Sequence, residues 1–187
     1  MKNARMQNTT VCSVLLLSLA AFVGATDQKT TQATLRDLAD RSAAPSLRLS
    51  DSSGRPLGLA AFHGKPVVVN FWATNCGGCL KELPDFVRLS EAYKDKGLTV
   101  VGISMDIMYD NLKGAPEGWA RVKPFIAAHR IKYPIVLDDG SAEKAFKITA
   151  LPATYLVDRA GRIAATYVGV VDAGNLEANI KALLAER

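Results

Sequence analysis

The feature that most constrains the fold is a run of apolar residues that leads into two closely spaced cysteines. Pro66 is followed by residues 67–72 (VVVNFW), whose β-branched and aromatic side chains are typical of a buried strand. After three intervening residues come Cys76 and Cys79, separated by two glycines (CGGC). They stand at the beginning of a segment, 76–96, that we expect to be helical. A buried strand, a short turn and a helix that begins at a cysteine pair therefore form the predicted centre of the fold.

Strands and helices alternate through the rest of the chain. Residues 47–59 have alternating leucines around the turn sequence DSSG, which predicts a hairpin before the central strand. Further strands are predicted at 98–104, 133–137, 153–157 and 163–167, and helices at 117–130, 142–146 and 175–185. This order predicts an α/β fold with a mixed central β-sheet flanked by helices, preceded by an N-terminal β-hairpin.

The first 25 residues have the features of an export signal. Lys2 and Arg5 give a positive start, residues 11–23 are apolar, and residues 23–25 (VGA) offer a cleavage site. The apolar stretch spans about 20 Å, less than the roughly 30 Å of a hydrocarbon core. We therefore expect a signal peptide at 1–25, with an uncleaved membrane anchor as the alternative, and a periplasmic or other extracytoplasmic location. A polar spacer is expected at 26–43 and a single folded domain at 44–187.

The cysteine count and the charge exclude several classes of protein. Cys12 lies inside the apolar stretch and is expected to be lost with the signal; a lipid-anchor cysteine would instead follow that stretch. Two cysteines then remain, too few for a structural disulfide framework. The formal net charge of +5 is dispersed and contains no basic block, so nucleic-acid binding gains no support.

The two remaining cysteines are placed for reversible disulfide chemistry. A cysteine at a helix N-terminus faces unpaired backbone N–H groups and the positive end of the helix dipole, which favour its thiolate. Cys79 returns to nearly the same helix face, so the two sulfurs can close a disulfide. We expect Cys76 to attack and Cys79 to resolve the mixed disulfide. Zinc is the less favoured alternative, because His63 and His129 are isolated from each other, and no metal is expected.

Longer motifs around the cysteines are similar to those of a known family. Residues 70–84 (NFWATNCGGCLKELP) resemble the active-site segment of the TlpA/ResA-like branch of the thioredoxin superfamily. The resemblance runs from about residue 45 to the C-terminus and includes the motifs at 64–66 (GKP), 102–106 (GISMD), 151–154 (LPAT) and 158–161 (DRAG). It implies a thioredoxin-like fold and the activity of a thiol–disulfide oxidoreductase.

The resemblance also implies roles for residues outside the cysteine pair. Pro152 matches a proline that is cis in this family and packs beside the disulfide, and Leu151 would offer main-chain groups to an extended substrate. Glu82 matches a glutamate that the family keeps near the cysteines. It lies one turn after Cys79, about 4.5 Å further along the helix, where it is expected to move protons. The alternative for Glu82 is a solvated helix carboxylate.

Several positions depart from the family pattern. Asn70 stands where thioredoxin has a buried aspartate, and because an amide does not titrate, Glu82 is the remaining acid–base candidate. Asn75 stands where a tryptophan usually precedes the first cysteine, which opens the surface beside Cys76 and makes Asn75 a candidate substrate contact. Trp72 is interpreted as a core residue, with substrate contact as the alternative.

The sequence therefore predicts an exported enzyme, without a cofactor, that exchanges disulfides with protein substrates, in the direction of reduction. The direction rests on the resemblance alone, and it implies a membrane-embedded thiol donor. The suggested settings are cytochrome c maturation and envelope redox homeostasis, and a monomer is expected. The alternatives are a thiol peroxidase of related fold, for which no arginine is obviously placed near Thr74, and a non-catalytic metal chaperone or binding module.

Overall fold

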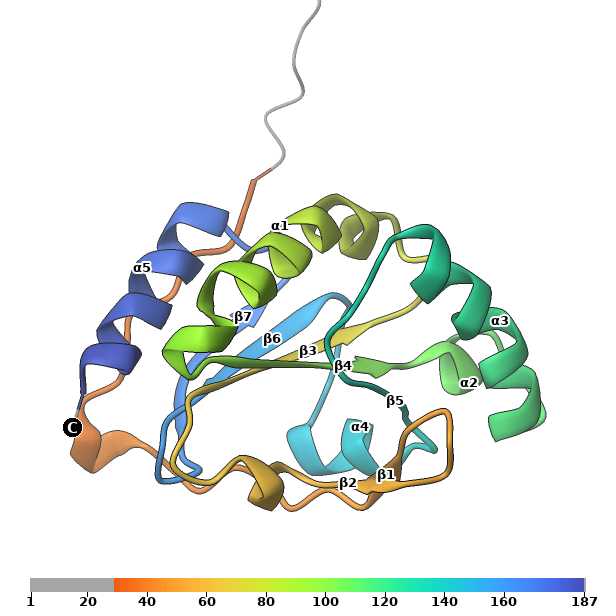
Figure 1. The fold of residues 1–187 in the computed structure, drawn as a ribbon, viewed down its shortest axis with the longest axis horizontal. Helices are drawn as coiled ribbons and strands as arrows, with labels where there is room; N and C mark the ends of the chain where they lie inside the picture. Colours follow the sequence, from red (N-terminus) through yellow and green to blue (C-terminus); the bar gives the residue numbers. More distant parts are fainter. Residues whose placement is uncertain (1–28, 187) are drawn as a thin grey trace, which may run out of the picture.

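A five-stranded sheet runs through the computed structural model, which describes residues 29–186 (Figure 1). The strand order is β5-β4-β3-β6-β7. Strands β3, β4 and β5 are mutually parallel, whereas β6 is antiparallel to β3 and β7 is antiparallel to β6. The strands are Val67–Trp72 (β3), Thr99–Ser104 (β4), Ile135–Leu137 (β5), Ala153–Val157 (β6) and Ile163–Val168 (β7). This mixed sheet confirms the predicted fold class.

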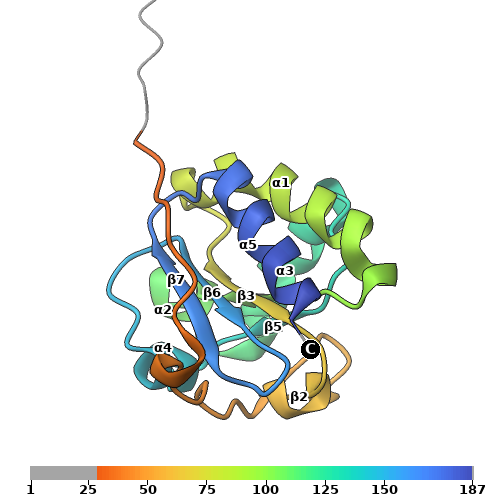
Figure 2. The ribbon, with the colours of Figure 1, turned by 90° about the vertical axis from the view of Figure 1, so that its left-hand side faces the viewer.

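Helices cover both faces of the sheet. The helices are Gly77–Tyr93 (α1), Asp106–Tyr109 (α2), Ala115–Ala128 (α3), Ser141–Phe146 (α4) and Ala173–Ala185 (α5), with 3-10 turns at Leu38–Asp40, Leu59–Phe62 and Lys94–Lys96. Both views show α1, α3 and α5 on one side of the sheet and α4 on the other (Figures 1 and 2). The predicted hairpin is present as β1 (Leu49–Ser50) and β2 (Pro56–Leu57), on the α4 side.

The central strand separates two apolar cores. All six residues of β3 are buried. Val68 and Trp72 belong to the core under α1, α3 and α5, whereas Val69 and Phe71 belong to the core on the α4 side. Because side chains alternate along a strand, Asn70 faces α1 together with Val68 and Trp72. A polar side chain therefore lies inside the core, below the helix that begins at the cysteine pair.

The segment in which we expected a polar spacer packs against the sheet. Thr31 pairs with Val171 and Ala43 with Arg162, so that the chain follows the outer side of β7 (Figure 2). The Arg41 guanidinium is buried and forms ion pairs with Asp158 and Glu186, at 3.2 Å and 2.7 Å. From Thr31 onward this stretch is therefore part of the folded unit, held by backbone pairing and one buried arginine. The hydropathy of a polar, threonine-rich stretch does not reveal either contact.

The short helix α2, directly after β4, was not predicted; it and the residue directly after it are hydrogen-bonded to Thr74 and Asn75, which precede the first cysteine. The export signal at 1–25 and Cys12 lie outside the described residues. Within residues 29–186, no helix combines the length and the apolar character needed to cross a membrane.

Candidate active site

The cysteine pair forms a disulfide at the beginning of α1. Cys76 is the N-cap residue of the helix, and its sulfur accepts a hydrogen bond from the backbone N–H of Cys79 at 3.3 Å. The two Cα atoms are 5.2 Å apart, within the normal range for a disulfide. In this oxidised form the two residues are equally enclosed, at 5% and 4% exposure. The N–H of Cys79, in the first turn of the helix, thus points at the Cys76 sulfur, and this position at the helix N-terminus favours a thiolate once the bond is reduced.

A loop with a cis proline lies directly against the CGGC turn. The Leu151–Pro152 peptide bond is cis, and Pro152 immediately precedes β6. A Cβ atom on Gly78 would lie 3.1 Å from the Cδ atom of Pro152 and 3.1 Å from a methyl carbon of Val170. The glycine at position 78 therefore lets two loops, at 151–152 and at 169–171, close over the disulfide.

Glu82 is buried in the core and does not lie on a solvated helix face. Its residue exposure is 2%. One carboxylate oxygen accepts a hydrogen bond from the side-chain amide of Asn70 at 3.0 Å, and the other accepts one from the backbone N–H of Val171 at 3.1 Å. Burial raises the pKa of Glu82 to about 7, although both hydrogen bonds act in the opposite direction. At neutral pH this carboxyl group is therefore poised between its two protonation states.

Asn70 connects this carboxyl group to the sheet. Its Nδ2 atom donates to Glu82 and also to the hydroxyl group of Thr154 in β6, both at 3.0 Å. All three side chains are buried. Thr154 follows Pro152 by two residues, so the polar group below α1 and the cis-proline loop are fixed by the same strand. The neutral amide at position 70 provides a donor to Glu82 without adding a second buried acid.

Asn75 and Thr74, which precede the first cysteine, are bound to the α2 region. The Thr74 backbone N–H and hydroxyl both donate to the carboxylate of Asp106. The exposed side chain of Asn75 donates to Asp110 at 2.5 Å, and Asp110 in turn pairs with Arg121 of α3. Sequence reasoning missed Asp110 and Arg121. The one available signal was the pair of acids four residues apart after a strand, which places both on one side of a helical turn.

Trp72 lies in the core. It is 3% exposed, and its ring packs against Phe125 of α3 at a centroid distance of 5.2 Å. The structure thus places Trp72 where the core interpretation expects it, with little of its surface open to contact with a substrate. Leu151 is half-buried and Asn75 is exposed, so of the four expected substrate contacts these two are open to the surface.

An apolar cavity of about 230 Å³ adjoins the cis-proline loop. Its lining includes Leu151 and, from the α2 region, Met105, Met108 and Tyr109. Met108 and Tyr109 are unusually exposed for apolar side chains, at 50% and 56%. A bulky apolar side chain of a bound polypeptide can be accommodated here, immediately beside the residue that precedes Pro152.

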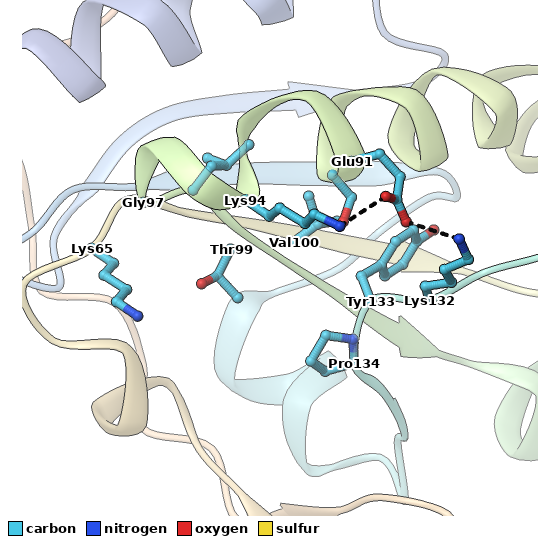
Figure 3. Close-up of a pocket in the computed structure, with 11 residues that line it drawn as sticks. Lys65, Glu91, Lys94, Gly97, Thr99, Val100, Lys132, Tyr133 and Pro134 are labelled. Carbon is cyan, nitrogen blue, oxygen red and sulfur yellow. Dashed lines mark hydrogen bonds and ion pairs between the residues drawn. The ribbon is translucent and has the colours of Figure 1, made fainter.

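A second cavity, of about 340 Å³, lies at the other end of the sheet (Figure 3). It contains Thr99, the first residue of β4, whereas the disulfide follows the last residue of the parallel strand β3. Its lysines Lys94 and Lys132 both pair with Glu91, as the dashed lines show. This cavity is therefore remote from the cysteines. In the described part of the chain, no cluster of three or more histidine, cysteine or acidic residues is arranged to hold a metal ion.

Comparisons with known proteins agree with this geometry. The model of the AhpC/TSA family matches residues 41–166. Two similar proteins are both named thiol-disulfide oxidoreductase ResA. The one from Bacillus thuringiensis subsp. konkukian is 30% identical over 139 residues, which cover 74% of this chain and 75% of that protein. The one from Bacillus cereus is 28% identical over 169 residues, with coverages of 90% and 92%. Among solved structures, a thiol:disulfide interchange protein from Chlorobium tepidum has a TM-score of 0.65 and 26% identity, covering 78% of this chain and 97% of that one.

Proposed function

Because the chain belongs to the AhpC/TSA family and is a thiol–disulfide oxidoreductase of the ResA type, we propose that it is an exported enzyme that reduces disulfides of protein substrates through Cys76 and Cys79. The observation that supports this most strongly is the disulfide at the N-terminus of α1, in contact with the loop that contains the cis bond before Pro152. That arrangement combines an activated sulfur with an adjacent surface for an extended chain.

In the proposed reaction the reduced enzyme transfers two electrons to the substrate. The Cys76 thiolate attacks one sulfur of a substrate disulfide, which breaks that S–S bond, forms a mixed disulfide and releases one substrate thiolate. The Cys79 thiolate then attacks the Cys76 sulfur, which closes the Cys76–Cys79 disulfide and releases the second substrate thiolate. Both released thiolates take up protons. A dithiol donor restores the enzyme by the same two exchanges in reverse.

Glu82 is proposed to accept the proton of Cys79 before the second exchange. It lies one turn after Cys79 on the same helix, and both residues are buried. With a pKa of about 7, the carboxyl group can take up a proton and release it again near neutral pH. Asn70 and Val171 orient it through one hydrogen bond to each oxygen.

The substrate is proposed to be an extended polypeptide that lies along the cis-proline loop. The main chain of Leu151 would pair with it, and the apolar cavity beside Leu151 would take a side chain close to the substrate cysteine. Asn75 is exposed next to Cys76 and would face the same chain. The open surface at these positions supports a protein as the substrate.

The cellular setting is proposed from the sequence. The signal-like residues 1–25 support an extracytoplasmic location, in which a reductase needs a membrane-embedded thiol donor. Haem-attachment cysteines in cytochrome c maturation, and other envelope disulfides, are proposed substrates. The protein is proposed to act as a monomer.

Insulin reduction and trapping experiments test the proposed function. The purified protein with a thiol donor should reduce insulin, and consume no hydrogen peroxide beyond the blank. Cys79→Ser should accumulate a mixed disulfide through Cys76, whereas Cys76→Ser should trap almost none, because the thiolate at the helix N-terminus attacks first. Peroxide consumption without insulin reduction, or equal trapping by the two variants, would contradict the proposal.

A further inference from the structure

The peptide group between Val170 and Val171 links the buried acid to the N-terminal segment. Its N–H, which belongs to Val171, donates to a carboxylate oxygen of Glu82 at 3.1 Å. Its C=O, which belongs to Val170, accepts a hydrogen bond from the backbone N–H of Thr31 at 2.7 Å. Thr31, one peptide group and Glu82 therefore form a continuous hydrogen-bond chain. In such a chain each bond polarises the next and strengthens it.

The N-terminal segment is fixed at this point by several additional contacts. Thr31 pairs in parallel with Val171, and its C=O accepts from the N–H of Asp172 at 2.9 Å. The Thr31 hydroxyl donates to the C=O of Val168 at 2.8 Å. Two residues after Thr31, the backbone N–H of Ala33 donates to the side-chain oxygen of Asn175 at 3.0 Å. Figure 2 shows the segment, in orange, beside β7. Residues 31–33 thus lie along the loop that connects β7 to α5, joined to it by an isolated β-bridge at Thr31 and by the hydrogen bond of Ala33.

The same loop also touches the cysteine turn. A methyl group of Val170 lies 3.1 Å from the position that a Cβ atom of Gly78 would occupy. Displacement of this loop would therefore disturb both the wall of the disulfide site and the donor to Glu82. Within residues 29–186, Val171 is the residue whose backbone N–H donates to the carboxylate of Glu82.

We propose that residues 31–33 are part of the active site, and that the amide of Thr31 is a positioning group that holds the Val170–Val171 peptide against Glu82 and stabilises the ionised carboxyl group. This inference rests on the proposed role of Glu82 in disulfide exchange. It assigns to a segment outside the thioredoxin-like motifs the task of adjusting the acid–base group of the reaction. Detachment of residues 31–33 favours the protonated acid, and their attachment favours the carboxylate.

Other groups near Glu82 also titrate, and a measurement must separate their titrations from that of Glu82. On α1 these are Asp85, whose charge raises the pKa of Glu82, and the two cysteines once they are reduced. The segment before β5 contributes Tyr133, whose own pKa is raised by burial and by the charge of Glu82. Strands β3 and β6 contribute Asn70 and Thr154, which do not titrate. The oxidised protein removes the thiols from the titration and is therefore the appropriate form.

The first test replaces the donor at position 31. In Thr31→Pro the backbone N–H that donates to the C=O of Val170 is absent. The Val170–Val171 peptide is then held less firmly against Glu82, and the ionised form of Glu82 is less stabilised. The midpoint of the Glu82 titration, followed by carboxyl carbon NMR on the full-length oxidised protein, should rise by at least about 0.5 pH unit, or about threefold in proton affinity. Thr31→Val keeps the N–H and removes only the hydroxyl contact to Val168, and should shift the midpoint by less than about 0.2 unit. Lys29→Pro controls for a proline in this exposed stretch.

The second test needs no substitution at Thr31, and stays informative if Thr31→Pro fails to fold. Coupling is reciprocal, so the Thr31 amide of the parent protein should be better protected from hydrogen exchange when Glu82 is ionised. The protection factor should rise by about threefold through the Glu82 midpoint, and Glu82→Gln should abolish this rise. Protection that is independent of pH, or equal midpoint shifts in Thr31→Val and Thr31→Pro, would overturn the inference. Both readouts use the resting oxidised protein, so a parent that fails to reduce insulin refutes the proposed function without affecting them.

Discussion

The carboxyl group of Glu82 lies between α1 and the sheet, where its ionised form loses most of its hydration. Two hydrogen bonds, from Asn70 and Val171, recover part of that loss. The net result is a pKa raised to about 7, because the desolvation of the charge outweighs the two donors. A buried acid with this pKa is able to exchange protons at neutral pH, which suits it to assist a thiol.

Replacement of Glu82 by glutamine tests this role. The amide preserves the shape and a hydrogen-bond acceptor, so Glu82→Gln should fold and keep Cys76 reactive. Disulfide exchange near neutral pH should slow by at least roughly tenfold, because the resolving thiol loses its base. Stopped-flow exchange rates and a thiolate absorbance titration provide the measurement. The exposed Glu91→Gln of the same helix is the matched control. Rates and titration curves that overlay those of the parent would reduce Glu82 to a structural residue.

At the level of single residues, the sequence predicted the reacting groups better than their surroundings. The cysteine pair and Pro152 are recognisable because they belong to local motifs with specific spacing. The burial of Glu82 was not predictable from its own helix, since its donor Val171 lies 89 residues away. The same holds for Asp110 and Arg121, which reach Asn75 only through the packing of α2 and α3.

Among the elements, the CGGC turn packs closely against the two loops beside it. Gly77 has no atom within 4 Å of an added Cβ, whereas Gly78 faces both Pro152 and Val170 at 3.1 Å. Gly77→Ala should therefore leave the oxidised protein as stable or up to about 1 kcal/mol more stable, because alanine favours the helix. Gly78→Ala should be less stable than Gly77→Ala by about 1–3 kcal/mol, because the proline ring has little room to move. Urea unfolding of both oxidised variants measures the difference. Equal stabilities would show that the loops containing Pro152 and Val170 shift to accommodate the added methyl group without cost.

The order of strands and helices was predictable because each has a clear hydrophobic period. The exceptions are the elements whose reason for folding is not in their own sequence. The helix α2 has only four residues, and Asp106 at its start is held by Thr74 and by the hydroxyl of Ser104. The N-terminal segment is held along β7 and the following loop by isolated β-bridges, because these parts of the chain offer it backbone hydrogen-bonding groups. Both contacts join parts of the chain that are far apart, which a local pattern does not encode.

Over the whole molecule, the buried carboxyl group of Glu82 connects a helix, two strands and a loop. Helix α1 carries it, β3 and β6 hold it through Asn70 and Thr154, and the loop between β7 and α5 caps it. Its protonation state therefore influences the stability of the complete domain, in addition to the chemistry at the cysteines. A folded domain that binds a proton more tightly than the unfolded chain becomes less stable as that proton is lost.

The pH dependence of unfolding follows from the direction of this shift. The carboxyl group of Glu82 has a pKa of about 7 in the folded protein, against an ordinary value of 4.5 in the unfolded chain. Below pH 4.5 both states are protonated, and the contribution is fully present. Between pH 4.5 and 7 the folded state holds more protons than the unfolded state, so the free energy of unfolding falls as pH rises, by about 3 kcal/mol in total. Other carboxyl groups with lowered pKa values, such as Asp158, lose their stabilising effect at more acidic pH and act in the opposite sense.

The quantity to measure is therefore the difference between the parent and Glu82→Gln, in urea unfolding of the oxidised proteins at pH 5 and pH 8. Glutamine does not titrate, so the parent should lose about 2.5 kcal/mol relative to the variant between these two pH values, because part of the total change already occurs below pH 5. A difference that stays constant with pH would mean that Glu82 is ionised throughout, and that its hydrogen bonds outweigh its burial.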